Sequence, residues 1–205
     1  MRARGLSRAR VHRSRVGTSG ARRRIMAPAR ASGDAPAWRA LADAFEGTFD
    51  AEMITVGEVL ARRATDDGRR MVLVDVRGDD ERAVSVIEGA MSAEEYERVR
   101  RTIGPHDAVF YCTIGYRSGR FAEKMNKARE AGDDVKYLNL YGSIVAYTHE
   151  GGELVDPKTG EKTNKVHTFG KQWSCVADGY EPVFYASAIA GGLSQMFKGL
   201  FKRKK

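Results

Sequence analysis

The chain has 205 residues, of which 42% are hydrophobic and 30% are charged, a composition typical of a globular protein that can bury a sizeable core. Its net charge of +8 is unevenly distributed: residues 1–33 hold ten arginines and no acidic residue, so residues 34–205 carry −2. This near-neutral body excludes a general electrostatic surface for nucleic acid, and two cysteines, Cys112 and Cys175, exclude a disulfide-rich scaffold.

Residues 1–33 are rich in Arg, Ala, Ser and Gly and are too polar to bury a core. A basic, acid-poor N-terminus is typical of an organelle transit peptide, and a nucleic-acid-binding arm is the alternative. Because the charge stops abruptly at Asp34, we expect a transit peptide. Ser, Thr and Ala among the arginines favour the chloroplast, with the mitochondrion as the alternative.

The segment that follows predicts a linker with one short helix and then the first elements of a domain. Residues 34–52 form the linker, in which apolar spacing predicts a helix from Ala37 to Phe49. Thr55 is a candidate N-cap for a helix that ends near residues 66–68. The apolar run 71–76 is expected of a strand buried on both faces.

Helices and strands continue to alternate downstream. A charged helix is predicted over Glu94–Arg101, and a strand over Val135–Leu140. Between them, a helix after the Ala108–Tyr111 strand presents an apolar face and has Gly132 as its candidate C-cap. The residues of that face are Phe121, Ala122, Met125 and Ala128. Alternating strands and helices indicate an α/β fold with a parallel sheet flanked by helices.

Cys112 lies between the Ala108–Tyr111 strand and a helix that we expect to open at Ser118. The backbone N–H groups of such a loop, with the positive end of the helix dipole, stabilise an anion and lower the pKa of a thiol. Gly115 permits a positive φ, and Arg117 adds a cation that can hold a charged sulfur. The alternative for Arg117 is an ion pair with a structural carboxylate. These neighbours favour a reactive thiol over the inert core thiol that an isolated cysteine would suggest.

The loop Cys112–Ser118 resembles the active-site loop of rhodanese-like sulfurtransferases. Residues 72–77 and 84–90 resemble the family's strand-Asp-x-Arg segment and the turn that follows it. Residues 138–147 resemble its Leu-x-Gly-Gly-Ile-x-Ala-Trp segment, and the likeness covers about residues 53–152. Three residues depart from the family pattern at turns and packing positions, namely Glu88, Ser143 and Tyr147.

This resemblance implies a sulfurtransferase that moves sulfane sulfur from a donor to a thiol or cyanide through a persulfide on Cys112. It places substrate and persulfide binding in the loop residues Thr113, Ile114, Gly115, Tyr116, Arg117 and Ser118. A six-residue Cys112–Arg117 loop accompanies sulfur rather than phosphate chemistry in the family. A single loop cation favours a small-molecule or protein persulfide over thiosulfate as donor. The resemblance implies neither cofactor nor metal, and the alternative is a non-catalytic binding module at an organelle membrane surface.

Three further residues are expected to support the site, and the second cysteine is weighed beside them. Asp75 and Arg77 follow a buried strand and are expected to hold neighbouring loops by ion pairing rather than to act in catalysis. Arg120 is placed beside the loop as a further supporting cation. Cys175 could resolve a Cys112 persulfide, but its neighbours show no activating pattern and favour a core thiol.

Residues 153–182 predict a β extension, with a hairpin that turns at Asp156–Gly160 between arms at 153–155 and 166–169. Trp173 and Tyr180 are expected to anchor it to the core.

Residues 183–205 form an amphipathic tail that ends in basic residues. Its uncharged stretch, 183–197, is shorter than the ~20 residues that span a bilayer. The tail predicts either a docked terminal helix or an interfacial helix in peripheral contact with anionic lipid.

Overall fold

In the computed structural model, the described residues are 37–65, 68–130, 132–170 and 173–184. The predicted transit peptide lies outside them, and so does the amphipathic tail except for residues 183–184. No helix among the described residues is long and apolar enough to cross a membrane.

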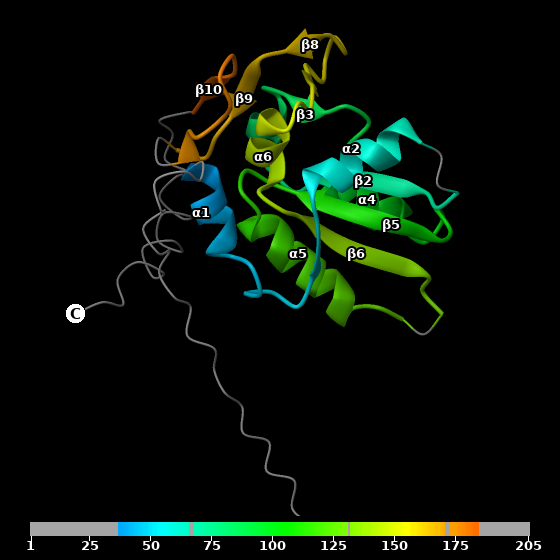
Figure 1. The fold of residues 1–205 in the computed structure, drawn as a ribbon. Helices are drawn as coiled ribbons and strands as arrows, with labels where there is room; N and C mark the ends of the chain where they lie inside the picture. Colours follow the sequence, from blue (N-terminus) through cyan, green and yellow to red (C-terminus); the bar gives the residue numbers. More distant parts are fainter. Residues whose placement is uncertain (1–36, 66–67, 131, 171–172, 185–205) are drawn as a thin grey trace, which may run out of the picture.

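A five-stranded parallel sheet forms the centre of the molecule (Figure 1). In spatial order its strands are β1 (Glu52–Ile54), β6 (Val135–Leu140), β5 (His106–Tyr111), β2 (Met71–Asp75) and β4 (Met91–Ser92). The middle strand, β5, is buried along its whole length. The α/β fold with a parallel sheet predicted from the sequence is therefore confirmed.

Six helices among the described residues accompany this sheet. They are α1 (Ala37–Asp43), α2 (Val56–Ala64), α3 (Asp79–Arg82), α4 (Ala93–Val99), α5 (Tyr116–Lys127) and α6 (Ser143–His149). Side chains alternate between the two faces of each strand. Leu73 and Val109 accordingly pack with residues of α1, α2 and α6, whereas Val72 and Ala108 pack with residues of α4 and α5. Both faces of the sheet are covered.

Several helix boundaries follow from local capping. The Thr55 Oγ1 accepts a hydrogen bond from the Glu58 N–H at 3.2 Å, and the Glu58 carboxylate accepts the Thr55 N–H at 2.8 Å, which confirms the predicted cap of α2. The predicted Ala37–Phe49 helix is too long, since α1 ends at Asp43 and the chain continues in turns. Ala128 is exposed and ends α5 with non-helical dihedrals, so it lies outside the apolar face and Gly132 is not the cap.

The β extension forms a hairpin, but with a different second arm from the one predicted. β7 (Leu154–Val155) pairs antiparallel with β8 (Lys162–Thr163), because the Asp156 N–H donates to the Glu161 carbonyl at 2.9 Å and closes the turn. β9 (Lys165–His167) pairs instead in parallel with β10 (Glu181–Val183). β7 also pairs with β3 (Val86–Ile87), which connects the extension to the preceding segment.

Two aromatic residues hold the extension in place. Trp173 is 3% exposed and belongs to the core on the α1, α2 and α6 face. The Tyr180 hydroxyl donates to the Gly152 carbonyl at 2.8 Å. In Figure 1, β9 and β10 lie beside α6 and α1, at one end of the sheet. The predicted anchoring by these residues is confirmed.

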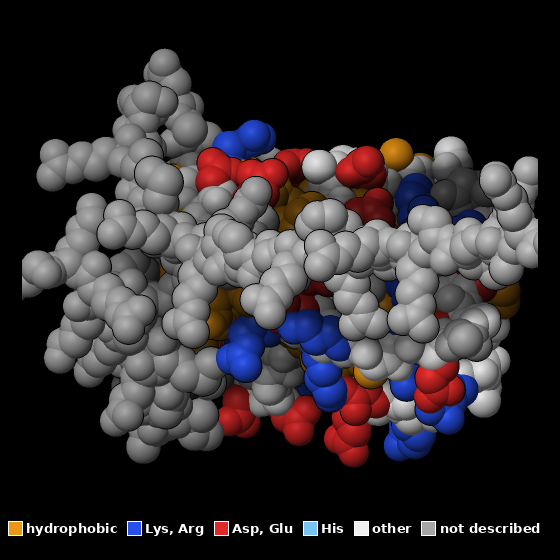
Figure 2. Space-filling model, turned by 90° about the horizontal axis from the view of Figure 1, so that it is seen from below, with side chains coloured by type: hydrophobic (Ala, Val, Ile, Leu, Met, Phe, Trp, Pro, Cys, Tyr) orange, Lys and Arg blue, Asp and Glu red, His pale blue; other side chains and the backbone are white. Residues whose placement is uncertain are grey.

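Charges of both signs lie next to one another on the face seen in Figure 2. Exposed ion pairs join Lys124 to Glu97 at 2.7 Å and Lys127 to Glu123 at 3.0 Å. The mixture of charges on the face in Figure 2 agrees with the near-neutral composition of residues 34–205.

Candidate functional site

Cys112 follows the last residue of β5, at the carboxyl end of the central strand. The Cys loop, residues 112–115, leads directly into α5, which begins at Tyr116 rather than at the predicted Ser118. Gly115 is the N-cap of α5 and has φ +112°, which confirms the positive φ expected of it. The sulfur therefore sits where open parallel sheets bind ligands.

Hydrogen-bond donors, not carbonyls, face the Cys112 sulfur. The Gly115 N–H donates to the Sγ at 3.2 Å, and the Ser118 hydroxyl lies 3.5 Å from it. The loop carbonyls turn towards α6, since the Ile144 N–H donates to the Cys112 carbonyl at 3.2 Å and Val145 donates to Thr113 at 3.3 Å. This arrangement stabilises a negatively charged sulfur.

Cys112 is both buried and acidic for a thiol. Its side chain belongs to a residue only 2% exposed. Burial raises the pKa of the thiol. The charge of Arg117 and the hydrogen bonds from Ser118 and Gly115 lower it by more than burial raises it, so the pKa lies below its ordinary value. A lowered pKa increases the share of the nucleophilic thiolate, while burial of the side chain restricts the approach of a donor.

Arg117 does not point free into solvent. Its guanidinium donates two hydrogen bonds to the Glu81 carboxylate, at 2.5 and 2.8 Å, and a third to the Thr113 Oγ1 at 3.2 Å. The guanidinium also lies over the Phe169 ring, 5.5 Å from its centroid. Burial lowers the pKa of Arg117, but Glu81 and Cys112 raise it above its ordinary value, so the cation is permanent. The positive charge of Arg117 therefore acts on both the Glu81 carboxylate and the Cys112 sulfur.

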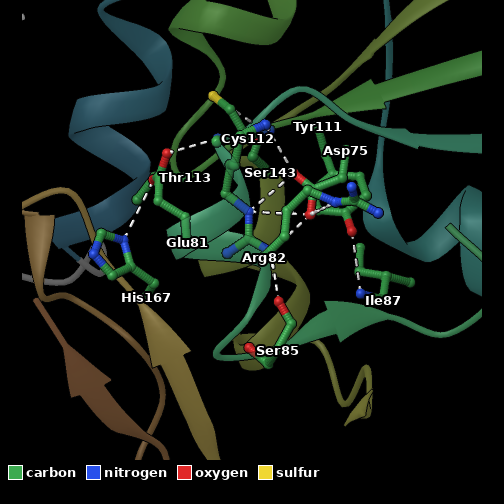
Figure 3. Close-up of polar contacts among 12 residues, drawn as sticks. Asp75, Glu81, Arg82, Ser85, Ile87, Tyr111, Cys112, Thr113, Ser143 and His167 are labelled. Carbon is green, nitrogen blue, oxygen red and sulfur yellow. Dashed lines mark hydrogen bonds and ion pairs between the residues drawn. The ribbon is translucent and has the colours of Figure 1, made fainter. Parts of the chain in front are cut away.

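Glu81 comes from α3 and is buried, 8% exposed. Burial raises the pKa of its carboxyl, but hydrogen bonds from Arg117 and His167 hold it well below the ordinary range. His167, on β9, places its Nδ1 3.3 Å from the Glu81 Oε1 (Figure 3). The extension thus supplies a side chain to the charged cluster beside the Cys loop.

Asp75 and Arg77 form a separate buried pair at the end of β2. The Arg77 Nη2 donates to the Asp75 Oδ2 at 2.7 Å and to the Ser85 carbonyl at 2.7 Å. The Arg77 backbone N–H donates to the Asp75 Oδ1 at 3.0 Å. These contacts tie the end of β2 to the segment before β3, which is the loop-holding arrangement expected of the pair.

The remaining predicted site residues differ in burial: Ile114 is buried, Tyr116 is half-buried and Arg120 is exposed. Ile114 is buried in the core, and the Tyr116 ring packs edge-on against Phe45 and Phe49, with centroids 5.2 Å apart in both cases. Arg120 is exposed on α5, and no hydrogen bond or ion pair joins it to the Cys loop among the contacts of the described residues. The structure therefore gives it no supporting contact, because its position on α5 faces solvent.

Cys175 is a free, half-buried thiol. Burial raises its pKa, and its sulfur contacts the Trp173 carbonyl at 3.7 Å. A raised pKa is what we expect of an unactivated core thiol.

Sequence reasoning missed Ser143 as a site residue. Its Oγ accepts the Cys112 N–H at 3.1 Å and lies 4.0 Å from the Cys112 Sγ. Ser143 has φ +52° and follows Gly142 at φ +64°. The sequence held one sign of this role: Ser143 stands where the rhodanese-like segment similar to residues 138–147 usually has glycine. Glu81 and His167 carried no such signal, because their partners lie far away in the sequence.

No cluster of three or more His, Cys, Asp or Glu that could hold a metal ion occurs in the described part of the chain. The site as it stands consists of a thiol, its donors and the Arg117–Glu81–His167 cluster.

No protein-family model and no curated protein matches the sequence. Solved structures do resemble it. A protein of unknown function and possible tyrosine phosphatase from Rhodopseudomonas palustris is 21% identical, with 56% of this chain and 91% of that chain covered and a TM-score of 0.41. A rhodanese-related protein from Thermoplasma volcanium is 17% identical, with 51% and 97% covered and a TM-score of 0.40.

A thiosulfate sulfurtransferase from Pseudomonas aeruginosa is 21% identical, with 62% of this chain and 24% of that chain covered and a TM-score of 0.44. Two other similar structures, from Staphylococcus aureus and Anabaena, are described as rhodanese-like domains. The similar structures thus include several from the family that the sequence motifs resemble. The chemistry of the site is inferred from the contacts around Cys112.

Proposed function

We propose that this chain is a rhodanese-type sulfurtransferase that carries sulfane sulfur as a persulfide on Cys112. One observation supports the proposal above all. A buried thiol at the carboxyl end of the central strand keeps a lowered pKa, because Arg117, Ser118 and the Gly115 N–H act on its sulfur. A thiolate held in this way is an activated nucleophile.

The proposed reaction has two displacement steps. The Cys112 thiolate attacks the outer sulfur of a donor persulfide, the new S–S bond forms, and the donor's S–S bond breaks to release its thiolate. An acceptor thiolate, or cyanide, then attacks the outer sulfur on Cys112. This step yields a new persulfide, or thiocyanate, and restores the Cys112 thiolate. No net oxidation or reduction occurs over the cycle.

The charge balance beside the sulfur supports a small-molecule or protein persulfide as the donor. Arg117 is the one arginine in residues 112–118, and Glu81 accepts two of its hydrogen bonds. Its positive charge is thereby largely compensated, which leaves little attraction for a dianion such as thiosulfate.

Intact mass spectrometry tests the proposal directly. The purified full-length chain is incubated with a low-molecular-weight persulfide, and one added sulfur is expected. The Cys112→Ser variant should remain unloaded, and the Cys175→Ser variant should load like the unchanged chain. Added cyanide should remove the sulfur and release thiocyanate in equal amount.

A non-catalytic binding module is the second candidate, and the 2% exposure of Cys112 favours it. Failure of every donor to load sulfur, with Cys112→Ser folded normally, would count for this module.

Under either function we propose chloroplast targeting through residues 1–33, with the mitochondrion as the alternative. We also propose peripheral membrane contact through residues 183–205. Unchanged flotation with anionic liposomes after deletion of residues 183–205 would remove the membrane proposal.

A further inference from the structure

His167 lies outside the segment that resembles the rhodanese-like family, yet it reaches the charged cluster beside Cys112. It belongs to β9 of the extension and is 7% exposed. Figure 3 shows it pointing towards Glu81, and its Nδ1 lies 3.3 Å from the Glu81 Oε1. Phe169, two residues further on, covers the Arg117 guanidinium at 5.5 Å. Two side chains of the extension therefore contact the Arg117–Glu81 pair.

One carboxylate oxygen is shared between two partners. The Glu81 Oε1 accepts a hydrogen bond from the Arg117 Nη2 at 2.8 Å and also faces the His167 Nδ1. Its negative charge opposes the effect of Arg117 on the Cys112 sulfur, because a carboxylate beside the guanidinium cancels part of its field. A positive charge on His167 would offset this carboxylate and leave more of the Arg117 charge acting on the thiolate.

We propose that His167 is a positioning residue that acts through Glu81 on Arg117, and that its protonation keeps Cys112 reactive below neutral pH. This inference deepens the proposed function and rests on it. Histidine is the side chain that ordinarily changes its charge between about pH 5 and 8. Protonation of His167 adds a charge that favours the Cys112 anion, so it opposes the loss of thiolate as pH falls.

Other charged groups around the cluster do not change over that range. Arg117 from α5 and Arg77 from the end of β2 are permanent cations, and Glu81 stays ionised because its carboxyl pKa is well below the ordinary range. Within the extension, His167 is paired in register with the uncharged Val183. Two residues away, the register partner of Lys165 is Glu181, a residue of opposite charge. The proposal therefore concerns the charge on His167 alone.

The test compares the rate of sulfur loading in the unchanged chain and in His167→Gln at two pH values. The donor ionises alike for both proteins, so the ratio of their rates removes its contribution. We expect His167→Gln to load about 3- to 10-fold more slowly at about pH 6 and within about 2-fold of the unchanged chain at about pH 8. His149→Gln is the matched control, because His149 is exposed and contacts the Cys175 carbonyl instead. An equal ratio at both pH values would overturn the proposal, since a merely structural role predicts it.

A second measurement needs neither sulfur transfer nor a change at His167. Coupling between two titrating groups is reciprocal. Nuclear magnetic resonance titration of the His167 imidazole should therefore show a lower midpoint in Cys112→Ser than in the unchanged chain, because the thiolate that favours His167 protonation is gone. A midpoint unmoved by Cys112→Ser would refute the coupling. If the unchanged chain loads no sulfur, the proposed function fails, and this titration still decides the role of His167.

Discussion

Asp75→Asn is expected to destabilise the fold strongly, because it removes the charge that compensates Arg77. Both side chains are 0% exposed, and the Arg77 Nη2 lies 2.7 Å from the Asp75 Oδ2. Removal of one partner from a buried pair leaves an uncompensated charge and costs about 3–5 kcal/mol. The asparagine Oδ1 can still accept the backbone N–H of Arg77, so we expect a value near the lower end, about 3 kcal/mol.

Urea denaturation followed by tryptophan fluorescence measures this loss as a lower midpoint with an unchanged m-value. The exposed pair Lys124–Glu97 is the comparison, with side chains 63% and 44% exposed. Glu97→Gln should cost no more than about 1 kcal/mol. A loss below about 1 kcal/mol for Asp75→Asn would refute the reasoning.

The double variant Asp75→Asn/Arg77→Met sharpens the same prediction. It removes the isolated cation as well, so it should be less destabilised than the sum of the two single variants by at least about 1 kcal/mol. Simple additivity would show that the two charges do not act on one another.

Two further predictions concern ionisation. Arg117→Gln removes the cation that lowers the Cys112 pKa, so burial should raise that pKa. Alkylation of Cys112 by iodoacetamide should then slow roughly 10-fold at neutral pH. An unchanged rate would mean that Ser118 and the Gly115 N–H are enough to keep the pKa low. Burial raises the pKa of the Asp107 carboxyl, but Arg69 and Arg62 lower it below the ordinary value, so its stabilising effect is present at neutral pH and is lost as pH falls through the folded pKa. Asp107→Asn should flatten the acid limb of a stability–pH curve, and an acid limb as steep as before would assign that limb to other groups.

The sheet and the Cys loop could be predicted because their signals are local. The apolar run 71–76 marks a buried strand, and the observed β2 ends at Asp75, one residue earlier. Gly115 marks the turn into α5, and its φ of +112° agrees. The predicted strand 135–140 coincides with β6, since its boundaries depend on the residues of that segment alone.

The contacts that complete the site could not be predicted in the same way. Arg117 and Glu81 are 36 residues apart, and their bidentate pair exists only because α3 and α5 meet at one end of the sheet. His167 depends on a further step, since β9 pairs with β10 rather than forming the second arm of the hairpin. No local pattern contains that pairing. The sequence therefore offered a structural carboxylate as an alternative partner for Arg117 but could not identify it as Glu81.

The pairing of β7 with both β3 and β8 has a practical consequence for any attempt to shorten this protein. A chain cut after Gly152 would match the segment that resembles a known domain, but it would remove β7, the strand that pairs with Val86 and Ile87. It would also open the pocket that Trp173 fills. The extension is therefore part of the folding unit, and we expect the shortened chain to unfold or aggregate rather than to behave as a minimal version of the protein.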